Sequence, residues 1–201
     1  VFNLSNLLAA VGSLVAFGHT PESSLEMVAK VATVPGRIEK ITPTVTKSSQ
    51  VQEHDFLTVV DYAHTPAALE SVLNALRSHC SGKLICVFGC GGDRDKGKRP
   101  LMAAIAERLA DEVIVTDDNP RYESPRQIMQ DILEGFAQSE SVITEHDRAA
   151  AIRQAIAMAT TGDVVLVAGK GHEQGQIVGD KVIPFSDVAE VKAALKDLGH
   201  V

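Results

Sequence analysis

Apolar residues recur along most of the chain in two alternating patterns. Short unbroken apolar runs, such as residues 84–88 and 164–168, have the length and composition of strands that are buried on both faces. The segments between such runs carry apolar residues at every third or fourth position, which is the spacing of an amphipathic helix. This alternation predicts an α/β domain with a doubly wound, mostly parallel, Rossmann-like sheet and helices on both of its faces.

The individual elements follow from the same patterns and from the glycines and prolines between them. We expect strands at residues 37–41, 56–61, 83–88, 112–116, 141–144 and 163–168. We expect helices at residues 66–79, 100–110, 125–138, 148–160 and 187 to about 198, three of them opening on a proline. Residues 176–178 and 181–184 are predicted to form a hairpin that turns at Gly179-Asp180. The polar stretch 42–54 is predicted to be a surface loop or another hairpin.

The first 36 residues are predicted to belong to a different domain from the rest. Apolar residues at helical spacing predict one helix between residues 4 and 18 and a second one from Pro21 to about Val31. Pro35-Gly36 then breaks the pattern. The chain starts inside the first helical pattern and without Met, so we expect it to be a piece of a longer protein. Residues 1–36 would be the short helical remnant of a preceding domain, and residues 37–201 a carboxy-terminal domain.

The composition restricts the class of protein. Asp and Glu number 26 against 19 Lys and Arg, and the net charge of −7 argues against a nucleic-acid-binding surface, which needs cations to neutralise phosphates. No apolar run approaches the ~20 residues of a membrane-spanning helix, and the start lacks a secretion signal. Cys80, Cys86 and Cys90 form no C-x-x-C pair, so buried free thiols in a reducing compartment are expected. We therefore expect a cytoplasmic protein without membrane insertion.

Charged and glycine-rich loops follow four of the predicted strands. They are DYAHTP at residues 61–66, GCGGDRDKGKR at 89–99, TDDNPR at 116–121 and GKGHE at 169–173. The carboxyl ends of parallel strands lie at one edge of the sheet, where doubly wound proteins bind their ligands. Four such loops at one edge therefore predict a binding site.

The loop at residues 89–99 satisfies part of a nucleotide P-loop pattern. Gly92 to Lys98 reads G-x-x-x-x-G-K, but Arg99 follows, so the Ser or Thr hydroxyl that would bind magnesium is missing. Charged side chains also occupy the loop interior, where a P-loop keeps its backbone amides free for phosphate. We expect the cations of this loop to bind a carboxylate or phosphate of a substrate, and P-loop kinase activity is the competing hypothesis.

Residues 118–121 have the chemistry to bind an amino acid. Pro120 fixes its own φ and restricts Asn119, so the backbone is stiff between an acidic and a basic side chain. Arg121 can bind a carboxylate, and Asp118 with Glu173 of another loop can bind an ammonium group. An Asn-Pro turn with solvated charges is the alternative interpretation.

Other loop residues permit two interpretations each. His64, which stands near Asp61, either contacts a nucleotide or phosphate or has a capping or core role. Lys170 and His172 either line the site or lie in solvent. Cys90 has no base nearby in sequence, so we expect no nucleophilic role for it, and the remaining histidines show no metal-ligand spacing. Neither a catalytic residue nor a metal ligand is predicted in this chain.

At these loops the sequence closely resembles the Mur ligases and, within them, the diaminopimelate-adding ligases of the MurE type. The resemblance spans essentially the whole chain and rests on DYAHTP at 61–66, GCGGDRDKGKRP at 89–100, DDNPR at 117–121 and GKGHE at 169–173. Asn3-x-x-Asn6 is similar to the element that ends the central ATP-binding domain of the family. Gly36-Arg37 is similar to the junction with the carboxy-terminal domain.

The resemblance implies a role for each matching residue. The residues that would bind meso-diaminopimelate are Arg94, Asp118, Asn119, Pro120, Arg121, Gly169 and Glu173. The residues at the ATP side of an interdomain cleft would be Asn3, Asn6, Arg37, Asp61 and His64. Diaminopimelate carries one more carboxylate than lysine, and lysine would leave a buried arginine unpaired, so Arg121 is expected to select between them.

The resemblance further implies an ATP-dependent, ADP-forming amide-bond ligase of peptidoglycan precursor synthesis. It would add meso-diaminopimelate to UDP-N-acetylmuramoyl-L-Ala-D-Glu through an acyl phosphate, with ATP and Mg²⁺ bound mainly by a central domain upstream. This chain would be the diaminopimelate-binding part and inactive alone. The competing hypotheses are a lysine-adding or folylpolyglutamate-type ligase and a non-catalytic amino-acid-binding module.

Overall fold

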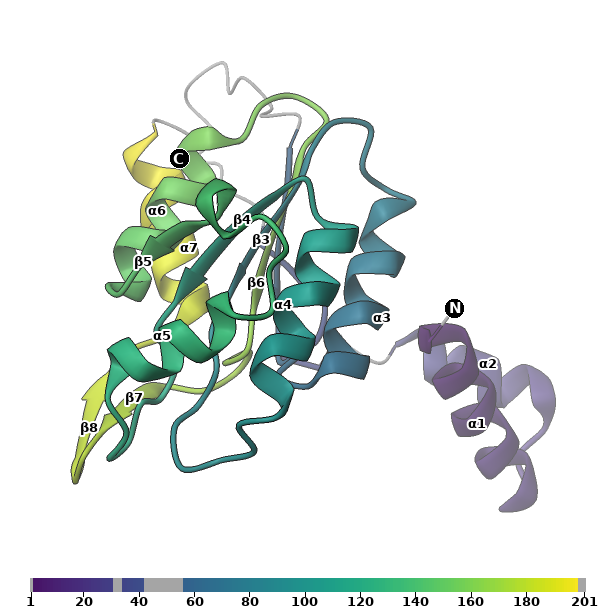
Figure 1. Ribbon diagram of the computed structural model, residues 1–201. Coiled ribbons are helices and arrows are strands. Elements are labelled where there is room, and N and C mark those ends of the chain that lie inside the picture. Colours follow the sequence, from purple (N-terminus) through teal and green to yellow (C-terminus); the bar gives the residue numbers. More distant parts are fainter. Residues whose placement is uncertain (1, 31–33, 42–55, 199–201) are drawn as a thin grey trace. The chain divides into compact units, whose positions relative to one another are not determined.

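The computed structural model describes residues 2–30, 34–41 and 56–198 (Figure 1). The chain divides into two compact units, residues 1–34 and residues 35–201. None of the helices in the described ranges combines the length and the apolar content needed to cross a membrane. The predicted loop or hairpin at residues 42–54 lies outside the described residues.

The first unit consists of two helices that contact each other, α1 (Phe2–Ala16) and α2 (Pro21–Ala29). The helix α2 begins at Pro21, as predicted. A proline is tolerated at the first helical position because the N–H that it lacks would have no helical partner there. The hydroxyl of Thr20 accepts a hydrogen bond of 3.2 Å from the backbone N–H of Ser23 and so caps this end. The predicted continuation to Val31 falls outside the described residues.

The second unit is built on a six-stranded sheet in the order β1-β2-β6-β3-β4-β5. Its strands are β1 (Glu39–Ile41), β2 (Leu57–Asp61), β3 (Leu84–Phe88), β4 (Glu112–Thr116), β5 (Ile143–Glu145) and β6 (Val164–Ala168). Every neighbouring pair is parallel except β1 with β2. The predicted doubly wound, mostly parallel sheet is therefore confirmed.

Helices cover both faces of this sheet. They are α3 (Pro66–Arg77), α4 (Lys98–Leu109), α5 (Pro125–Leu133), α6 (Arg148–Met158) and α7 (Asp187–Asp197). The helices α3, α4 and α5 contribute to one apolar cluster, while α6 and α7 contribute to a second cluster on the opposite face (Figure 1). A two-stranded hairpin, β7 (Gly175–Val178) with β8 (Lys181–Pro184), precedes α7 as predicted.

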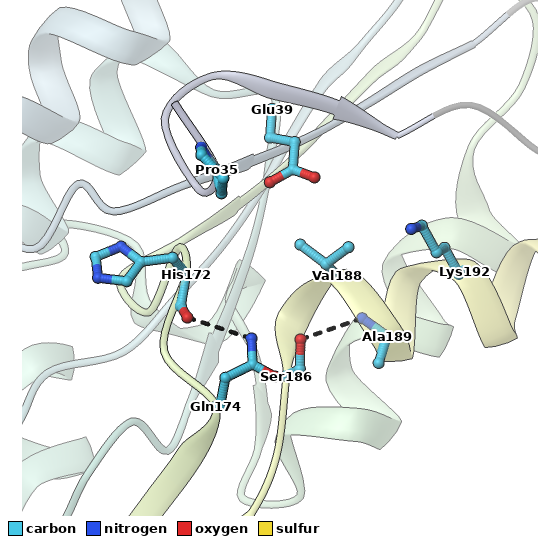
Figure 2. Close-up of a pocket in the computed structure, with 8 residues that line it drawn as sticks. All are labelled: Pro35, Glu39, His172, Gln174, Ser186, Val188, Ala189 and Lys192. Carbon is cyan, nitrogen blue, oxygen red and sulfur yellow. Dashed lines mark hydrogen bonds between the residues drawn. The ribbon is translucent and has the colours of Figure 1, made fainter. Parts of the chain in front are cut away.

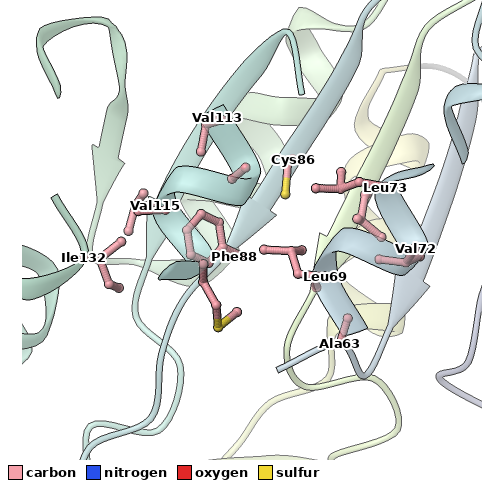
Figure 3. Packing of buried hydrophobic residues seen from close by; sticks show 14 of the residues in the cluster. Ala63, Leu69, Val72, Leu73, Cys86, Phe88, Val113, Val115 and Ile132 are labelled. Carbon is pink, nitrogen blue, oxygen red and sulfur yellow. The ribbon is translucent and has the colours of Figure 1, made fainter. Parts of the chain in front are cut away.

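The core explains why the central strands are unbroken apolar runs. In β3, Leu84, Cys86 and Phe88 belong to the cluster under α3, α4 and α5, and Figure 3 shows Cys86 and Phe88 within it. The alternating residues Ile85 and Val87 belong to the cluster under α6 and α7. Successive side chains of a strand point to opposite faces, so a strand between two helical layers needs apolar residues at every position.

Several predicted boundaries are wrong by two to five residues. The helices α3 and α6 each end two residues early, and β1 starts two residues late. The helix α4 begins at Lys98 rather than residue 100, because a proline is tolerated anywhere in the first turn, where N–H groups lack helical partners. The helix α5 ends at Leu133 rather than residue 138. A Cβ on Gly135 would lie 2.2 Å from the carbonyl oxygen of Pro100, so the chain leaves the helix where it approaches α4 closely. Residues 139–141 form a 3₁₀ turn, and β5 starts only at residue 143.

The carboxylate of Asp163 joins residues 160–163 to the start of β3 at the amino-terminal edge of the sheet. Its carboxylate accepts hydrogen bonds from the backbone N–H of Lys83 at 2.6 Å and of Thr160 at 2.8 Å, and from the Thr160 hydroxyl at 3.0 Å. Burial alone would raise the pKa of Asp163, but these hydrogen bonds outweigh burial and lower it. Folding therefore favours the ionised carboxylate.

The replacement Asp163→Asn is expected to reduce the free energy of unfolding at pH 7 by about 1–2 kcal/mol, because it removes hydrogen bonds to a charged group. A lowered pKa stabilises the fold above the unfolded-state value of about 3.9 and loses this effect as the pH falls through the folded-state value. The difference between wild type and variant, measured by urea denaturation, should therefore stay constant from pH 7 to about pH 5 and shrink as the pH falls below about 4. Asp197→Asn, at an exposed position, is the control, and a pH-independent difference would contradict the prediction.

Candidate functional site

The four loops predicted to form a site do meet at one edge of the sheet. They follow β2, β6, β3 and β4, which are adjacent and parallel, so their carboxyl ends coincide. Backbone hydrogen bonds join the loops directly: Gly169 N–H donates to the Asp61 carbonyl at 3.0 Å, and Gly92 N–H donates to the Asn119 carbonyl at 2.9 Å. The charged residues of these loops therefore lie in one contiguous region.

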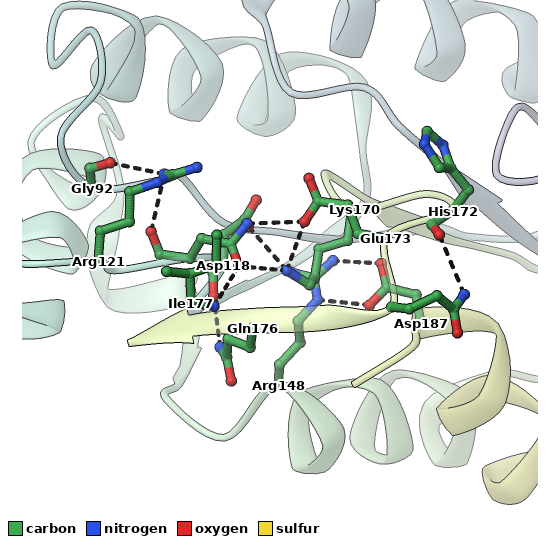
Figure 4. A network of polar contacts seen from close by, with 12 residues as sticks. Gly92, Asp118, Arg121, Arg148, Lys170, His172, Glu173, Gln176, Ile177 and Asp187 are labelled. Carbon is green, nitrogen blue, oxygen red and sulfur yellow. Dashed lines mark hydrogen bonds and ion pairs between the residues drawn. The ribbon is translucent and has the colours of Figure 1, made fainter. Parts of the chain in front are cut away.

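Lys170 lies at the centre of a polar network between the loops after β4 and β6 (Figure 4). Its side chain has no exposed surface, and its ammonium group donates to Asn119 Oδ1 at 2.8 Å and contacts Glu173 Oε2 at 3.1 Å and Asp118 Oδ1 at 3.5 Å. Asn119 Nδ2 donates to the same Glu173 oxygen at 2.9 Å. Of the two interpretations of Lys170, solvent exposure is therefore wrong.

Glu173 is ionised in this environment. Burial would raise the pKa of its carboxyl group, but hydrogen bonds from Asn119 and Lys170, and the charges of Lys170 and Arg121, lower it. Gly169 provides the room for its neighbour Asp118, because a Cβ on Gly169 would lie 3.1 Å from Asp118 Oδ2. The loops thus present two carboxylates beside a buried cation.

Arg121 lies at the edge of this network, with a left-handed backbone φ of 51°. Its Nη1 donates to the Gly92 carbonyl at 2.9 Å and lies 3.4 Å from the Asn119 carbonyl oxygen. The side chain is partly exposed, so the expectation of a buried arginine is wrong. Pro120, which precedes it, is buried, and its carbonyl oxygen would lie 1.9 Å from a Cβ on Gly92. The glycine-rich loop therefore packs directly on the loop that carries Arg121.

The β7–β8 hairpin holds the same loop from the other side. Arg121 N–H donates to the Ile177 carbonyl at 3.0 Å, and Gly179 N–H donates to the Arg121 carbonyl at 2.8 Å. Ile177 N–H also donates to Asn119 Oδ1 at 2.9 Å, and Gln176 Nε2 donates to the Asp118 carbonyl at 2.6 Å. The hairpin was predicted, but its contacts with residues 118–121 were not, because nothing local in either segment indicates them.

Most cations of the glycine-rich loop have partners within the protein, and for the fully buried Arg99 this corrects the expectation that it binds a substrate. Arg99 is fully buried, and its guanidinium donates to Asp131 at 2.6 Å and to Glu123 at 2.9 Å. Lys98 donates to the His64 carbonyl at 2.8 Å. Lys96 lies 3.5 Å from the same Glu123 carboxylate. Arg99 and Lys98 therefore tie the loop to the rest of the domain, whereas the side chain of Lys96 is 64% exposed.

Arg94 differs from Arg99 and Lys98, the two cations that tie the loop to the domain. Its side chain is exposed, and its Nη1 donates a hydrogen bond of 3.1 Å to the carbonyl of its neighbour Asp93. The loop backbone at Asp93 is held by Glu123, which accepts from its N–H at 2.6 Å. Arg94 is thus a guanidinium at the rim of the loop, available to an anionic ligand.

A second cluster lies around Tyr62, a residue that the sequence analysis did not single out. The Arg37 guanidinium lies 4.7 Å from the centre of the Tyr62 ring. The centre of this ring is 4.5 Å from that of the His64 ring and 5.3 Å from that of the His172 ring. His64 Nδ1 is hydrogen-bonded to the Tyr62 carbonyl at 2.8 Å. The position of Tyr62 directly after Asp61, at the end of a predicted strand, is the feature of the sequence that could have indicated its place in the site.

Asp61 has a local bonding role in this cluster. Its Oδ2 accepts from Ile38 N–H at 2.7 Å and its Oδ1 from Ala63 N–H at 2.8 Å, and its side chain is buried. These bonds hold the turn that carries Arg37 against the end of β2. The structure therefore brings Arg37, Asp61 and His64 together as predicted, with Asp61 as their support.

A pocket of about 390 Å³ opens beside this second cluster (Figure 2). Pro35, Glu39, His172, Gln174 and residues of α7 line it. Some polar groups of its lining already have hydrogen-bond partners within the protein: Gln174 Nε2 donates to the His172 carbonyl, and Glu39 accepts from Gly36 N–H. The charged loops, and not this pocket, are the stronger candidate site, because several opposite charges converge there.

The remaining predicted site residues, Asn3 and Asn6, lie in α1 of the first unit, and the side chain of Asn6 is exposed.

The structure also bears on metal binding and on the cysteines. Within the described ranges no three His, Cys, Asp or Glu side chains gather closely enough to hold a metal ion. Cys90 is buried against Met102, and burial raises the pKa of its thiol to about 12, so it is protonated at neutral pH. Cys86 is buried likewise, whereas Cys80 is only partly buried.

Comparisons with known proteins agree with this architecture. Residues 47–171 match the family described as "Mur ligase, glutamate ligase domain". The UDP-N-acetylmuramoyl-L-alanyl-D-glutamate–2,6-diaminopimelate ligase of Coxiella burnetii is 52% identical over 96% of this chain, and its counterpart of Synechococcus elongatus is 51% identical over 98%. The chain spans 38% of the length of each of these relatives.

Solved structures give the same result. A structure of a ligase with the same name superimposes with a TM-score of 0.75 at 42% identity, covering 100% of this chain and 39% of that one. The UDP-N-acetylmuramate–alanine ligase of Thermotoga maritima shares the fold, with a TM-score of 0.63 at 18% identity over 98% of this chain and 38% of its own. Because the family match covers more than half of its residues, the chain belongs to the Mur ligases, of which it contains the glutamate ligase domain.

Proposed function

We propose that the chain is the carboxy-terminal, amino-acid-binding part of a cytoplasmic ATP-dependent ligase that adds meso-diaminopimelate to UDP-N-acetylmuramoyl-L-Ala-D-Glu. The observation that carries this proposal is the convergence of opposite charges at one edge of the sheet: Arg121 is bonded to the Gly92 carbonyl at 2.9 Å and lies 3.4 Å from the carbonyl oxygen of Asn119, whose side chain is bonded to Glu173. Asp118 belongs to the same network. Relatives of about 50% identity that are named 2,6-diaminopimelate ligases support the choice of amino acid. Residues 1–36 would be the end of the central ATP-binding domain and residues 37–201 the carboxy-terminal domain.

The charges of the site fit both ends of an amino acid. Arg121 has further N–H donors besides Nη1, and Arg94 adds an exposed guanidinium, so together they suit a carboxylate. Glu173 and Asp118 suit an ammonium group, and Asn119, Pro120 and Gly169 hold these side chains in position. Binding in this way would orient the other amine of the amino acid as the nucleophile.

The chemistry proposed for the whole enzyme is amide formation through an activated acid. The side-chain carboxylate of the D-glutamate is converted to an acyl phosphate, the amine of diaminopimelate attacks its carbonyl carbon, and phosphate leaves as the C–N bond forms. The contribution of this chain is positioning of the amine, which accelerates such a step by converting it to an intramolecular one. ATP, when bound, supplies the phosphoryl group.

Arg37, His64 and Tyr62 fit the edge of a nucleotide site. A guanidinium over an aromatic ring, beside an imidazole, presents both a cation for phosphate and a flat apolar surface for a nucleoside. Asp61 would support this edge, and the resemblance would assign Asn3 and Asn6 of the first unit to ATP binding as well. The described part of the chain offers no group of metal ligands, so Mg²⁺ would be bound mainly by the central domain.

The chain alone is expected to have no ATP-dependent ligase activity, because it spans 38% of the relatives' length and would lack the main ATP and UDP-substrate sites. The test compares the chain with the full-length enzyme in an assay for ADP and ligated product. Calorimetric titration of the full-length enzyme with meso-diaminopimelate, and with lysine as the control ligand, tests the amino acid directly. Ligation by the isolated chain, or equal binding of lysine, would contradict the proposal.

A further inference from the structure

Lys170 makes an arrangement that the proposed substrate contacts do not explain. Its side chain has no exposed surface, yet it carries a charge and lies among residues that would bind the amino acid. Burial of an ammonium group is costly unless the protein supplies acceptors and opposite charge. The polar partners of Lys170 are Asn119, Glu173 and Asp118. All three are residues that would bind the amino acid.

The partners of Lys170 come from two different loops. Asn119 and Asp118 follow β4, while Glu173 follows β6, with β3 between these two strands in the sheet. The Asn119 amide donates to Glu173 at 2.9 Å, and its oxygen accepts from Lys170 at 2.8 Å. The three side chains therefore close a triangle of hydrogen bonds that ties one loop to the other (Figure 4).

The two oxygens of Glu173 have different surroundings. Oε2 receives both the Asn119 amide at 2.9 Å and the Lys170 ammonium at 3.1 Å. Within the described part of the chain the hydrogen bonds to this carboxylate all go to Oε2, and the side chain of Glu173 is 32% exposed. One oxygen is thus fixed from behind by buried groups, while the other is left for a ligand.

We propose that Lys170 is a positioning residue for the amino-acid substrate: it fixes Glu173 and Asn119 so that Glu173 Oε1 receives the substrate's ammonium group. Lys170 itself does not touch the substrate. This inference rests on the proposed function, and it assigns Lys170 to specificity for the amino acid and not to nucleotide binding.

Electrostatics gives the inference a second consequence. Lys170 is one of the groups that lower the pKa of Glu173, against the effect of burial. Without the lysine, the pKa of Glu173 rises, and a protonated Glu173 no longer attracts an ammonium group. Removal of Lys170 should therefore make the KM for the amino acid sensitive to pH in the acidic-to-neutral range, with tighter binding as the pH rises.

The test uses the full-length ligase with Lys170→Met, which keeps the length of the side chain without its charge. The KM for meso-diaminopimelate should rise by about 10- to 100-fold, the size expected when hydrogen bonds to a charged group are lost. The KM for ATP should stay within about twofold, since that ligand lies elsewhere. The elevated KM should fall as the pH is raised, whereas the wild-type KM should change less. Lys196→Met, at an exposed lysine of α7, is the matched control and should behave as wild type.

The outcomes separate three possibilities. A merely structural lysine predicts a lower kcat from fewer folded molecules, with both KM values and their pH dependence unchanged, and this result would overturn the inference. If the wild-type enzyme does not ligate diaminopimelate at all, the proposed function fails instead. If Lys170→Met does not yield folded protein, Lys170→Gln, which keeps a hydrogen-bond donor without the charge, replaces it. This variant is also expected to have a raised KM for diaminopimelate and an unchanged KM for ATP, and an unchanged KM for diaminopimelate would overturn the inference.

Discussion

The replacement Arg121→Ala in the full-length ligase is expected to lower kcat/KM for meso-diaminopimelate by ~100- to 1,000-fold, because two charge-assisted hydrogen bonds to a carboxylate are lost. Arg121 is held for this role by backbone bonds to the hairpin on one side and by its bond to the Gly92 carbonyl on the other. Alanine has the same Cβ as arginine, so the left-handed φ of 51° adds no further cost to the substitution. The KM for ATP should change little.

The substrate preference distinguishes this prediction from a general loss of activity. Lysine lacks the second carboxylate, so the ratio of kcat/KM for diaminopimelate to that for lysine should fall in the variant. Arg126→Ala, at an exposed position of α5, is the control and should leave the ratio unchanged. Steady-state assays with both amino acids provide the measurement. An unaltered ratio in Arg121→Ala would favour a lysine-adding or folylpolyglutamate-type ligase.

The replacement Asp187→Ala is expected to destabilise the fold by about 3–5 kcal/mol, because it leaves a buried arginine without its counter-charge. Arg148 of α6 and Asp187 of α7 both have fully buried side chains, and two hydrogen bonds of 2.8 Å join them. Arg148 also donates to the carbonyl of Ala168 at 2.9 Å, and its Nη1 has no hydrogen-bond partner among the residues that the structure describes.

The same two helices provide a matched control for this prediction. Arg153 of α6 and Glu190 of α7 form a pair at 3.5 Å, with side chains that are 49% and 29% exposed. Glu190→Ala should change the free energy of unfolding by less than about 1 kcal/mol, since solvent screens exposed pairs. Urea denaturation followed by circular dichroism measures both variants. Equal effects of the two substitutions would show that burial of the Arg148–Asp187 pair is not what matters.

The sequence was sufficient for the elements whose residues interact locally or face apolar layers on both sides. The runs at residues 84–88 and 164–168 predicted β3 and β6, because strands under two helical layers need apolar side chains throughout. The end of α5 was not predictable, because it depends on the approach of Gly135 to Pro100, a residue of another helix. Periodicity along one segment contains no information on such contacts.

The site shows the same division. The charged loops were placed correctly at one edge, because the topology of a parallel sheet requires it. The roles of single cations were not predictable: Arg99 is paired with Glu123 and Asp131, which lie 24 and 32 residues away, and Lys170 is buried despite its glycine-rich surroundings. A charge within a loop indicates a polar environment, but it does not tell whether the partner is a ligand or another side chain.

The contacts of the β7–β8 hairpin have a consequence for evolution and for protein engineering. Three of the bonds that hold residues 119–121 use only main-chain atoms of the hairpin, at Ile177 and Gly179. Main-chain atoms are the same in almost every amino acid, so most substitutions in the hairpin preserve these bonds as long as its backbone is kept. The hairpin can therefore diverge in sequence, or carry a reporter group at an exposed position such as Val182, while the loop that would choose the amino acid keeps its shape.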